Sequence, residues 1–73
     1  MYKIYKNRSG DQLLFRAIPG GYVVRLAMKL GEGDWRVCSR KKKIPEHGLE
    51  HLYFERDLTD NEAKTEFPFL KAD

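Results

Sequence analysis

The segment from Leu13 to Arg40 constrains the fold most, because two groups of turn-forming residues divide it into three runs. Pro19-Gly20-Gly21 separates the first run from the second, and Gly31-Glu32-Gly33-Asp34 separates the second from the third. In the middle run, large apolar residues occupy every second position from residue 22 to residue 30, as in a strand with one buried face. The segment therefore predicts three antiparallel strands joined by tight turns.

The turns also predict a register for these strands. If Gly20 and Gly21 form a two-residue hairpin loop, Phe15 lies opposite Leu26 and Leu13 lies opposite Met28. If residues 31–34 form the next loop, Leu30 lies opposite Trp35 and Met28 lies opposite Val37. The apolar face then comprises Leu13, Phe15, Ala17, Tyr22, Val24, Leu26, Met28, Trp35 and Val37.

The same register brings basic side chains together on the other face. Arg16, Arg25 and Arg40 fall side by side, with Lys29 beside Arg36. Because like charges directly opposite each other destabilise a sheet, such a row requires carboxylates, water or an anionic partner. We therefore expect a basic, partner-binding face that consists of Arg16, Arg25, Lys29, Arg36, Arg40, Lys41, Lys42 and Lys43.

The basic face is not purely polar. It also carries Leu14, Ile18, Val23, Ala27 and Cys38. Because exposed apolar clusters are uncommon, we expect part of this face to be covered. The C-terminal segment, a second subunit or a binding target could each provide that cover.

The rest of the chain adds shorter elements. Tyr2–Lys6 predicts a first strand, and residues 49–56 fit either a helix or a strand, with the strand favoured because Gly48 weakens a helix there. Thr59 and Glu62 have the spacing of a capping box, which predicts a short helix from Asp60 to about residue 67, before Pro68.

Together these patterns predict a mostly β fold, and the alternative fold class is α+β. We expect a small, twisted antiparallel meander or partly closed barrel of four or five strands, followed by a short C-terminal helix. A chain of 73 residues makes a single domain, 1–73. A domain of this size leaves little room for a deep pocket.

The charges are divided unevenly along the chain. Residues 1–43 carry eleven Lys and Arg against three Asp and Glu, whereas residues 44–73 carry three against eight. Such asymmetry can mark a site for nucleic acid or for another acidic partner. Alternatively, the acidic half folds across the basic half and neutralises it.

Candidate groups for chemistry are few. Cys38, His47 and His51 are weak candidates for metal ligands, because Gly48 disfavours the helix that would place both histidines on one side. Their spacing fits no nucleophilic site either. We therefore expect no metal, no cofactor and no enzymatic activity.

These observations favour a small, non-enzymatic interaction or regulatory protein. It would dock on a larger protein or complex with an acidic surface, through the basic face or through a free sheet edge at Tyr2–Lys6 or near Arg40. The alternative is a small β-barrel module that binds nucleic acid by contacting phosphates. A homodimer is possible, and the single cysteine and the absence of a long apolar run predict a cytoplasmic protein outside the membrane.

Overall fold

One antiparallel sheet dominates the computed structural model, which describes residues 1–72. Within that range the sheet has six strands: β1 (Tyr2–Lys6), β2 (Gln12–Ile18), β3 (Tyr22–Lys29), β4 (Trp35–Val37), β5 (Lys43–Pro45) and β6 (Tyr53–Leu58). The 3-10 turn η1 (Glu46–Leu49) precedes β6, and helix α1 (Asp60–Glu66) and the 3-10 turn η2 (Pro68–Ala72) follow it. The predicted fold class is confirmed: the protein is mostly β, with an open sheet and a short C-terminal helix.

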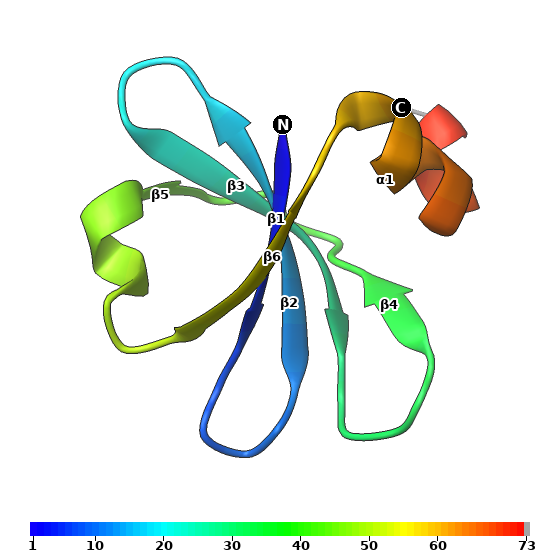
Figure 1. Cartoon of the computed structure of the whole chain (residues 1–73), viewed down its shortest axis with the longest axis horizontal. Coiled ribbons are helices and arrows are strands. Elements are labelled where there is room, and N and C mark those ends of the chain that lie inside the picture. The colour runs from blue at the N-terminus through cyan, green and yellow to red at the C-terminus, as the bar shows by residue number, and fades with distance from the viewer. Residues whose placement is uncertain (73) are drawn as a thin grey trace.

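The strand order places the free edges of the sheet. The order is β4-β3-β2-β1-β6, and β5 pairs with β3 beyond the end of β4 (Figure 1). The prediction that Tyr2–Lys6 forms a free edge is therefore wrong, because β1 lies between β2 and β6. The strand near Arg40 does lie at an edge, where β4 and β5 share one side of β3. Pro45 lies in β5, where the missing N–H of a proline is tolerated.

The register between β2 and β3 differs from the predicted one. Ile18 pairs with Tyr22, so the loop has three residues instead of two, and Gly20 and Gly21 adopt φ angles of 91° and 81°. An irregularity after Leu14 then leaves Leu26 as an extra residue in β3. As a result Phe15 lies opposite Arg25, whereas the predicted pairing of Leu13 with Met28 is confirmed.

The pairing of β3 with β4 is also shifted by one residue. Val37 lies opposite Ala27, and Met28 lies opposite Arg36. The connection is longer than the predicted four-residue loop because Leu30 belongs to it: the Gly33 N–H donates to the Leu30 carbonyl at 2.9 Å. Val37 is 53% exposed, so its predicted place in the apolar face is wrong.

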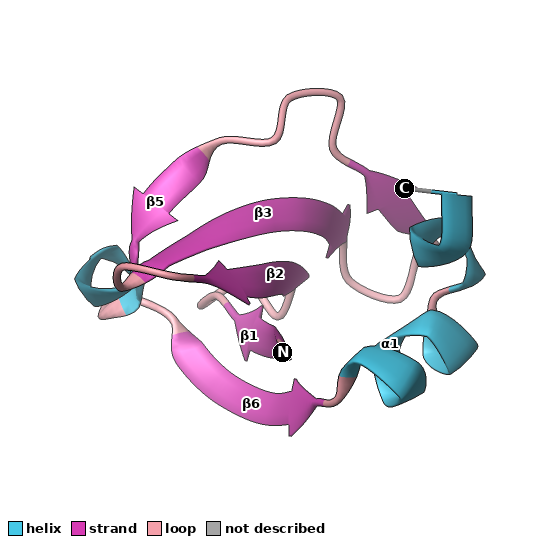
Figure 2. Ribbon diagram, turned by 90° about the horizontal axis from the view of Figure 1, so that it is seen from above, coloured by secondary structure: helices cyan, strands magenta, loops and turns pink. Residues whose placement is uncertain are grey.

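Both faces of the sheet are apolar, and each is covered by a different segment (Figure 2). We call the side packed against α1 and η2 the helix face. Its core contains Tyr2, Ile4, Leu14, Val24, Leu26, Ala27, Leu58, Ala63, Phe67 and Leu70. We call the other side the η1 face. Its core contains Leu13, Phe15, Val23 and Leu49, with Tyr5, Ala17, Met28, Ile44 and Leu52 packed around them. Of the three covers left open by the sequence, the C-terminal segment is the one that covers the helix face in this structure.

Residues 49–56, which fitted either a helix or a strand, divide between the two. Leu49 ends η1, and β6 begins at Tyr53. β6 pairs with β1 along its length, so the favoured strand is present over the second half of this segment. None of the helices in residues 1–72 is long and apolar enough to cross a membrane.

The predicted capping box begins α1. The Glu62 N–H donates to Thr59 Oγ1 at 3.2 Å, and the Thr59 N–H donates to Glu62 Oε1 at 3.0 Å. The bond from the Thr59 backbone lowers the pKa of Glu62. This bond therefore favours folding above the ordinary pKa of a glutamate, and its contribution is lost as the pH falls through the lowered value.

We expect Thr59→Ala to lower the free energy of unfolding by about 1 kcal/mol, because the substitution removes the side-chain cap. Thr65→Ala is the matched control. The Thr65 hydroxyl donates to the Asn61 carbonyl inside the helix, a bond that adds little, and we expect a change within about 0.5 kcal/mol. Urea denaturation of both variants measures the difference, and equal effects would contradict the cap.

Candidate functional site

The predicted basic row does not form, because its arginines lie on different faces. Residues directly opposite each other in adjacent strands share a face of the sheet. Arg16 lies opposite Tyr2 and Val24 on the helix face. Arg25 lies opposite Phe15 on the η1 face. The three-residue loop is the physical reason for this separation, because it places Arg16 opposite Val24 and Arg25 opposite Phe15.

The other predicted basic residues divide in the same way. Lys29 lies opposite Trp35 on the helix face, whereas Arg36 lies opposite Met28 on the η1 face. Lys43 lies opposite Val24, and its Nζ lies 4.5 Å from the centre of the Tyr22 ring. The remaining members lie in the connection between β4 and β5: Arg40, Lys41 and Lys42.

The carboxylates of the C-terminal half pair with other cations. The pairs are Lys3–Asp57 at 3.2 Å, Lys6–Glu55 at 3.3 Å, the N-terminal ammonium with Asp60 at 3.2 Å, and Arg56–Glu66. The hydrogen bonds that Arg56 donates to the Glu66 carboxylate raise the pKa of Arg56. The acidic half therefore neutralises β1, the N-terminus and its own arginine.

In contrast, most of the predicted basic set has no such partner. Within residues 1–72, the members without a carboxylate within 4.0 Å are Arg16, Arg25, Lys29, Arg36, Arg40, Lys42 and Lys43. Arg25 is half-buried, so part of this residue lies against other protein atoms. Because no carboxylate of the described chain pairs with Arg25, its guanidinium is free to bind an external anion.

Arg25 lines an apolar hollow on the η1 face, with a volume of about 380 Å³. The lining residues are Asn7, Leu13, Phe15, Arg25, Met28, Ile44, Gly48, Leu49, His51 and Leu52. β2 and β3 form its base, and β5 and η1 form its sides. We call it the Arg25 hollow.

Local contacts hold η1 against the sheet and so shape the Arg25 hollow. The Glu46 N–H donates to the Gly21 carbonyl at 2.9 Å, and Leu49 is buried among the residues of the η1 face. Gly48 packs close to β5: a Cβ there would lie 3.2 Å from Ile44 Cγ2. A glycine at this position therefore lets the turn approach the strand closely.

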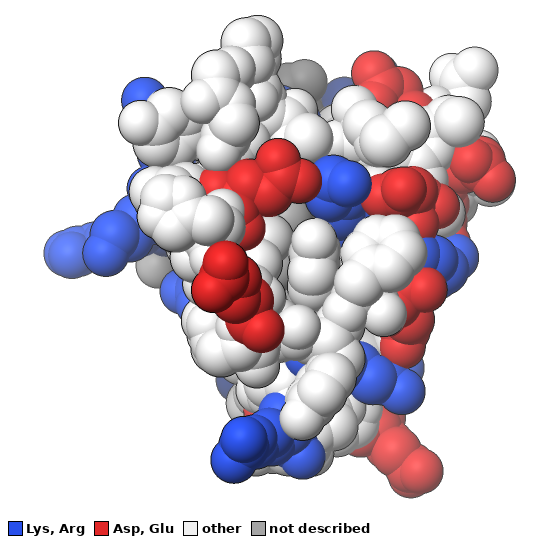
Figure 3. Space-filling view, turned by 60° about the vertical axis from the view of Figure 1, so that its left-hand side comes forward, with Lys and Arg blue, Asp and Glu red and all other residues white. Residues whose placement is uncertain are grey.

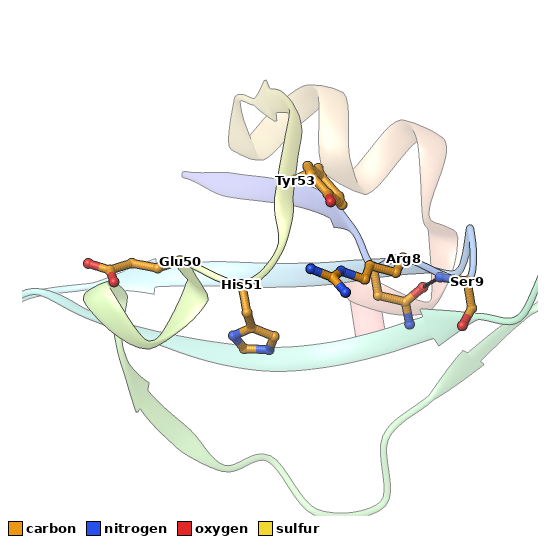
Figure 4. Close-up of a pocket in the computed structure, with 6 residues that line it drawn as sticks. Arg8, Ser9, Glu50, His51 and Tyr53 are labelled. Carbon is orange, nitrogen blue, oxygen red and sulfur yellow. Dashed lines mark hydrogen bonds between the residues drawn. The ribbon is translucent and has the colours of Figure 1, made fainter.

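A second, more polar hollow of about 440 Å³ adjoins the first (Figure 4). Asn7 and His51 line both, and Arg8, Ser9, Glu50 and Tyr53 complete it. Asn7 Oδ1 accepts from the Ser9 and Asp11 N–H groups, each at 3.0 Å, which fixes the turn that carries Arg8. Figure 4 shows the carboxylate of Glu50 pointing away from Arg8. We call this the Arg8 hollow.

Arg8 was not predicted as a site residue, because nothing but its charge distinguishes it in a turn. His51 was predicted only as a weak metal ligand, beside Cys38 and His47. Within residues 1–72, no three His, Cys, Asp or Glu side chains group closely enough to hold a metal ion. Cys38 is half-buried at the end of β4, where its N–H donates to the Leu26 carbonyl at 2.8 Å.

The surface on the η1 side carries both signs of charge. Figure 3 brings this side forward and shows acidic and basic side chains interspersed with uncharged surface. A continuous basic face is therefore absent from this view. Cations here act at particular positions, beside apolar surface, and not as one large field.

No protein-family model, curated protein or solved structure matches this chain. Its function has to follow from its own residues. Two features of those residues are informative: the arginines without carboxylate partners, and the paired hollows on the η1 face.

We expect Arg25→Glu to change the free energy of unfolding by less than about 0.5 kcal/mol, because no carboxylate in the described chain pairs with Arg25. Lys3→Glu is the contrasting variant. It places a carboxylate opposite Asp57, and we expect a loss of roughly 1 kcal/mol. Thermal and urea denaturation of both variants test this, and a large loss for Arg25→Glu alone would contradict the assignment.

Proposed function

We propose that this protein is a small, non-enzymatic binding protein that docks on an acidic surface of a larger protein. The docking surface is the η1 face with the adjoining β4–β5 edge. Its cations are Arg25, Arg36, Arg40 and Lys42. The Arg8 and Arg25 hollows lie on the same side and supply apolar and polar contacts.

The observation that carries this proposal is the distribution of ion pairs. The carboxylates of the C-terminal half pair with Lys3, Lys6 and Arg56, while Arg25 and Arg36 have no carboxylate within 4.0 Å in the described chain. Cations without a carboxylate partner favour association with a partner that places carboxylates opposite them. Apolar side chains beside them add the burial that a stable complex needs.

The arrangement favours a protein partner over the alternative, a nucleic acid. Single-stranded nucleic acids are bound by basic grooves in which aromatic rings stack on the bases. Here the exposed aromatic residues Tyr53 and Phe54 lie on β6, and the β4–β5 connection with its basic residues lies at the opposite edge. Phe54 is also in contact with Tyr5, at 5.6 Å between ring centres, and with Lys3. A cytoplasmic partner is in keeping with the single free thiol, Cys38.

Affinity capture from a nuclease-treated lysate of the source cells tests the proposal. The bait proteins are the unmodified chain, Arg36→Glu and the control Lys64→Glu, which makes the same change of charge on α1. We expect the unmodified chain and Lys64→Glu to retain the same protein, and Arg36→Glu to retain roughly tenfold less.

Two results would contradict the proposal. Equal loss with Arg36→Glu and Lys64→Glu would show that only net charge matters. Capture that disappears on nuclease treatment, together with oligonucleotide binding that weakens steeply with salt, would favour the nucleic-acid alternative.

A further inference from the structure

We infer that the Arg25 hollow receives an apolar side chain of the partner, with a neighbouring carboxylate bound to Arg25. The inference rests on the proposed function and names the chemistry of the partner segment: an apolar residue flanked by acidic ones. Three observations carry it, namely the apolar base of the hollow, the unpaired arginine in its wall and its continuity with the Arg8 hollow.

The base of the hollow is suited to an apolar group. Leu13, Phe15 and Leu49 are buried, so the floor is fixed by the core of the η1 face. Met28, Ile44 and Leu52 are only half-buried and retain exposed apolar surface around it. Covering that surface with an apolar side chain removes it from water, which is favourable. A volume of about 380 Å³ accommodates an aromatic or branched aliphatic side chain.

Arg25 supplies the charge complementarity. Its directly opposed neighbour on β2 is Phe15, so no acidic residue faces it across that strand pair. A guanidinium carries five N–H donors in a fixed planar arrangement and binds a carboxylate through two parallel hydrogen bonds. A carboxylate next to the inserted apolar group would therefore meet donors that the described chain leaves without an anionic partner.

The two hollows together favour a peptide segment over a small free acid. They share Asn7 and His51, so a chain that leaves the apolar hollow passes directly into the more polar one. There Arg8 and His51 provide further donors, and the Glu50 carboxylate points away (Figure 4). A segment with carboxylates on both sides of one apolar residue would use Arg25 and Arg8 at once.

Titrations followed by ¹⁵N NMR with three capped tripeptides test the inference. The probes are acetyl-Asp-Phe-Asp-amide, its Asp-Ala-Asp analogue without the ring, and its Asn-Phe-Asn analogue without charge. We expect the first to shift the amides of Arg25, Leu49 and Leu52 saturably. Each analogue should bind roughly tenfold more weakly or worse, because it lacks either the buried ring or the charge.

The protein variants are matched by residue type and by burial. Arg25→Gln should weaken the binding of Asp-Phe-Asp roughly tenfold, while the contact of the second carboxylate with Arg8 remains. Arg16→Gln, the same change of a half-buried arginine on the helix face, should leave it unchanged. Unaltered melting temperatures for both variants keep this comparison independent of folding.

The outcomes separate this inference from the proposed function. Equal binding of Asp-Ala-Asp and Asp-Phe-Asp, with shifts confined to the β4–β5 connection, would overturn the inference and leave acidic docking standing. Absence of saturable shifts at the hollow would also overturn the inference. So would equally tight binding of phenylbutyrate, a further probe with a ring and one carboxylate, because the ligand would then be a small acid and not a peptide. Capture of the lysate partner by Arg36→Glu at full strength would overturn the proposed function itself.

Discussion

The irregular pairing of β2 with β3 determines most of this structure. The hairpin begins with a three-residue loop, and the extra residue at Leu26 then restores the pairing of Leu13 with Met28. An extra residue in one strand reverses the alternation of side chains beyond it. Val23 and Arg25 therefore share the η1 face with Met28, although these residues would not all share a face in a regular strand. The three-residue loop places Arg25 on this face, and the extra residue brings Met28 to the same face beside the hollow.

Because both faces of this small sheet are apolar, each face has to be covered by another segment of the chain. Phe67 and Leu70 from the C-terminal segment cover the helix face, and Leu49 from η1 contributes to the other. α1 has a complete capping box and packs a buried Ala63, whereas η1 is a single 3-10 turn with no side-chain cap. The cover of the η1 face is the less extensive of the two. The hollows open on that face, so the incompleteness of the cover and the proposed binding surface have the same origin.

Local signals in the sequence predicted most of the elements, although not β5 or η1, and non-local geometry determined the site. Thr59 and Glu62 identify the start of α1 because a capping box involves only adjacent residues of the chain. Alternation identified the strands for the same reason. The interior position of β1 was not predictable in this way, because it depends on β6 returning from more than forty residues away to pair with it. The basic row failed because one residue of register moves a side chain to the other face, and no local signal in Pro19-Gly20-Gly21 distinguished a three-residue loop from a two-residue loop.

The proposed binding site therefore depends on the placement of Arg16 and Arg25 on opposite faces of the sheet. Cross-strand nuclear Overhauser effects in the isotopically labelled protein test this placement directly. The structure predicts contacts between Arg16 and Val24 and between Phe15 and Arg25, together with contacts from Arg25 to the residues of η1. Contacts between Arg16 and Arg25 and between Phe15 and Leu26 would contradict it, because they would restore the regular register and remove Arg25 from the hollow.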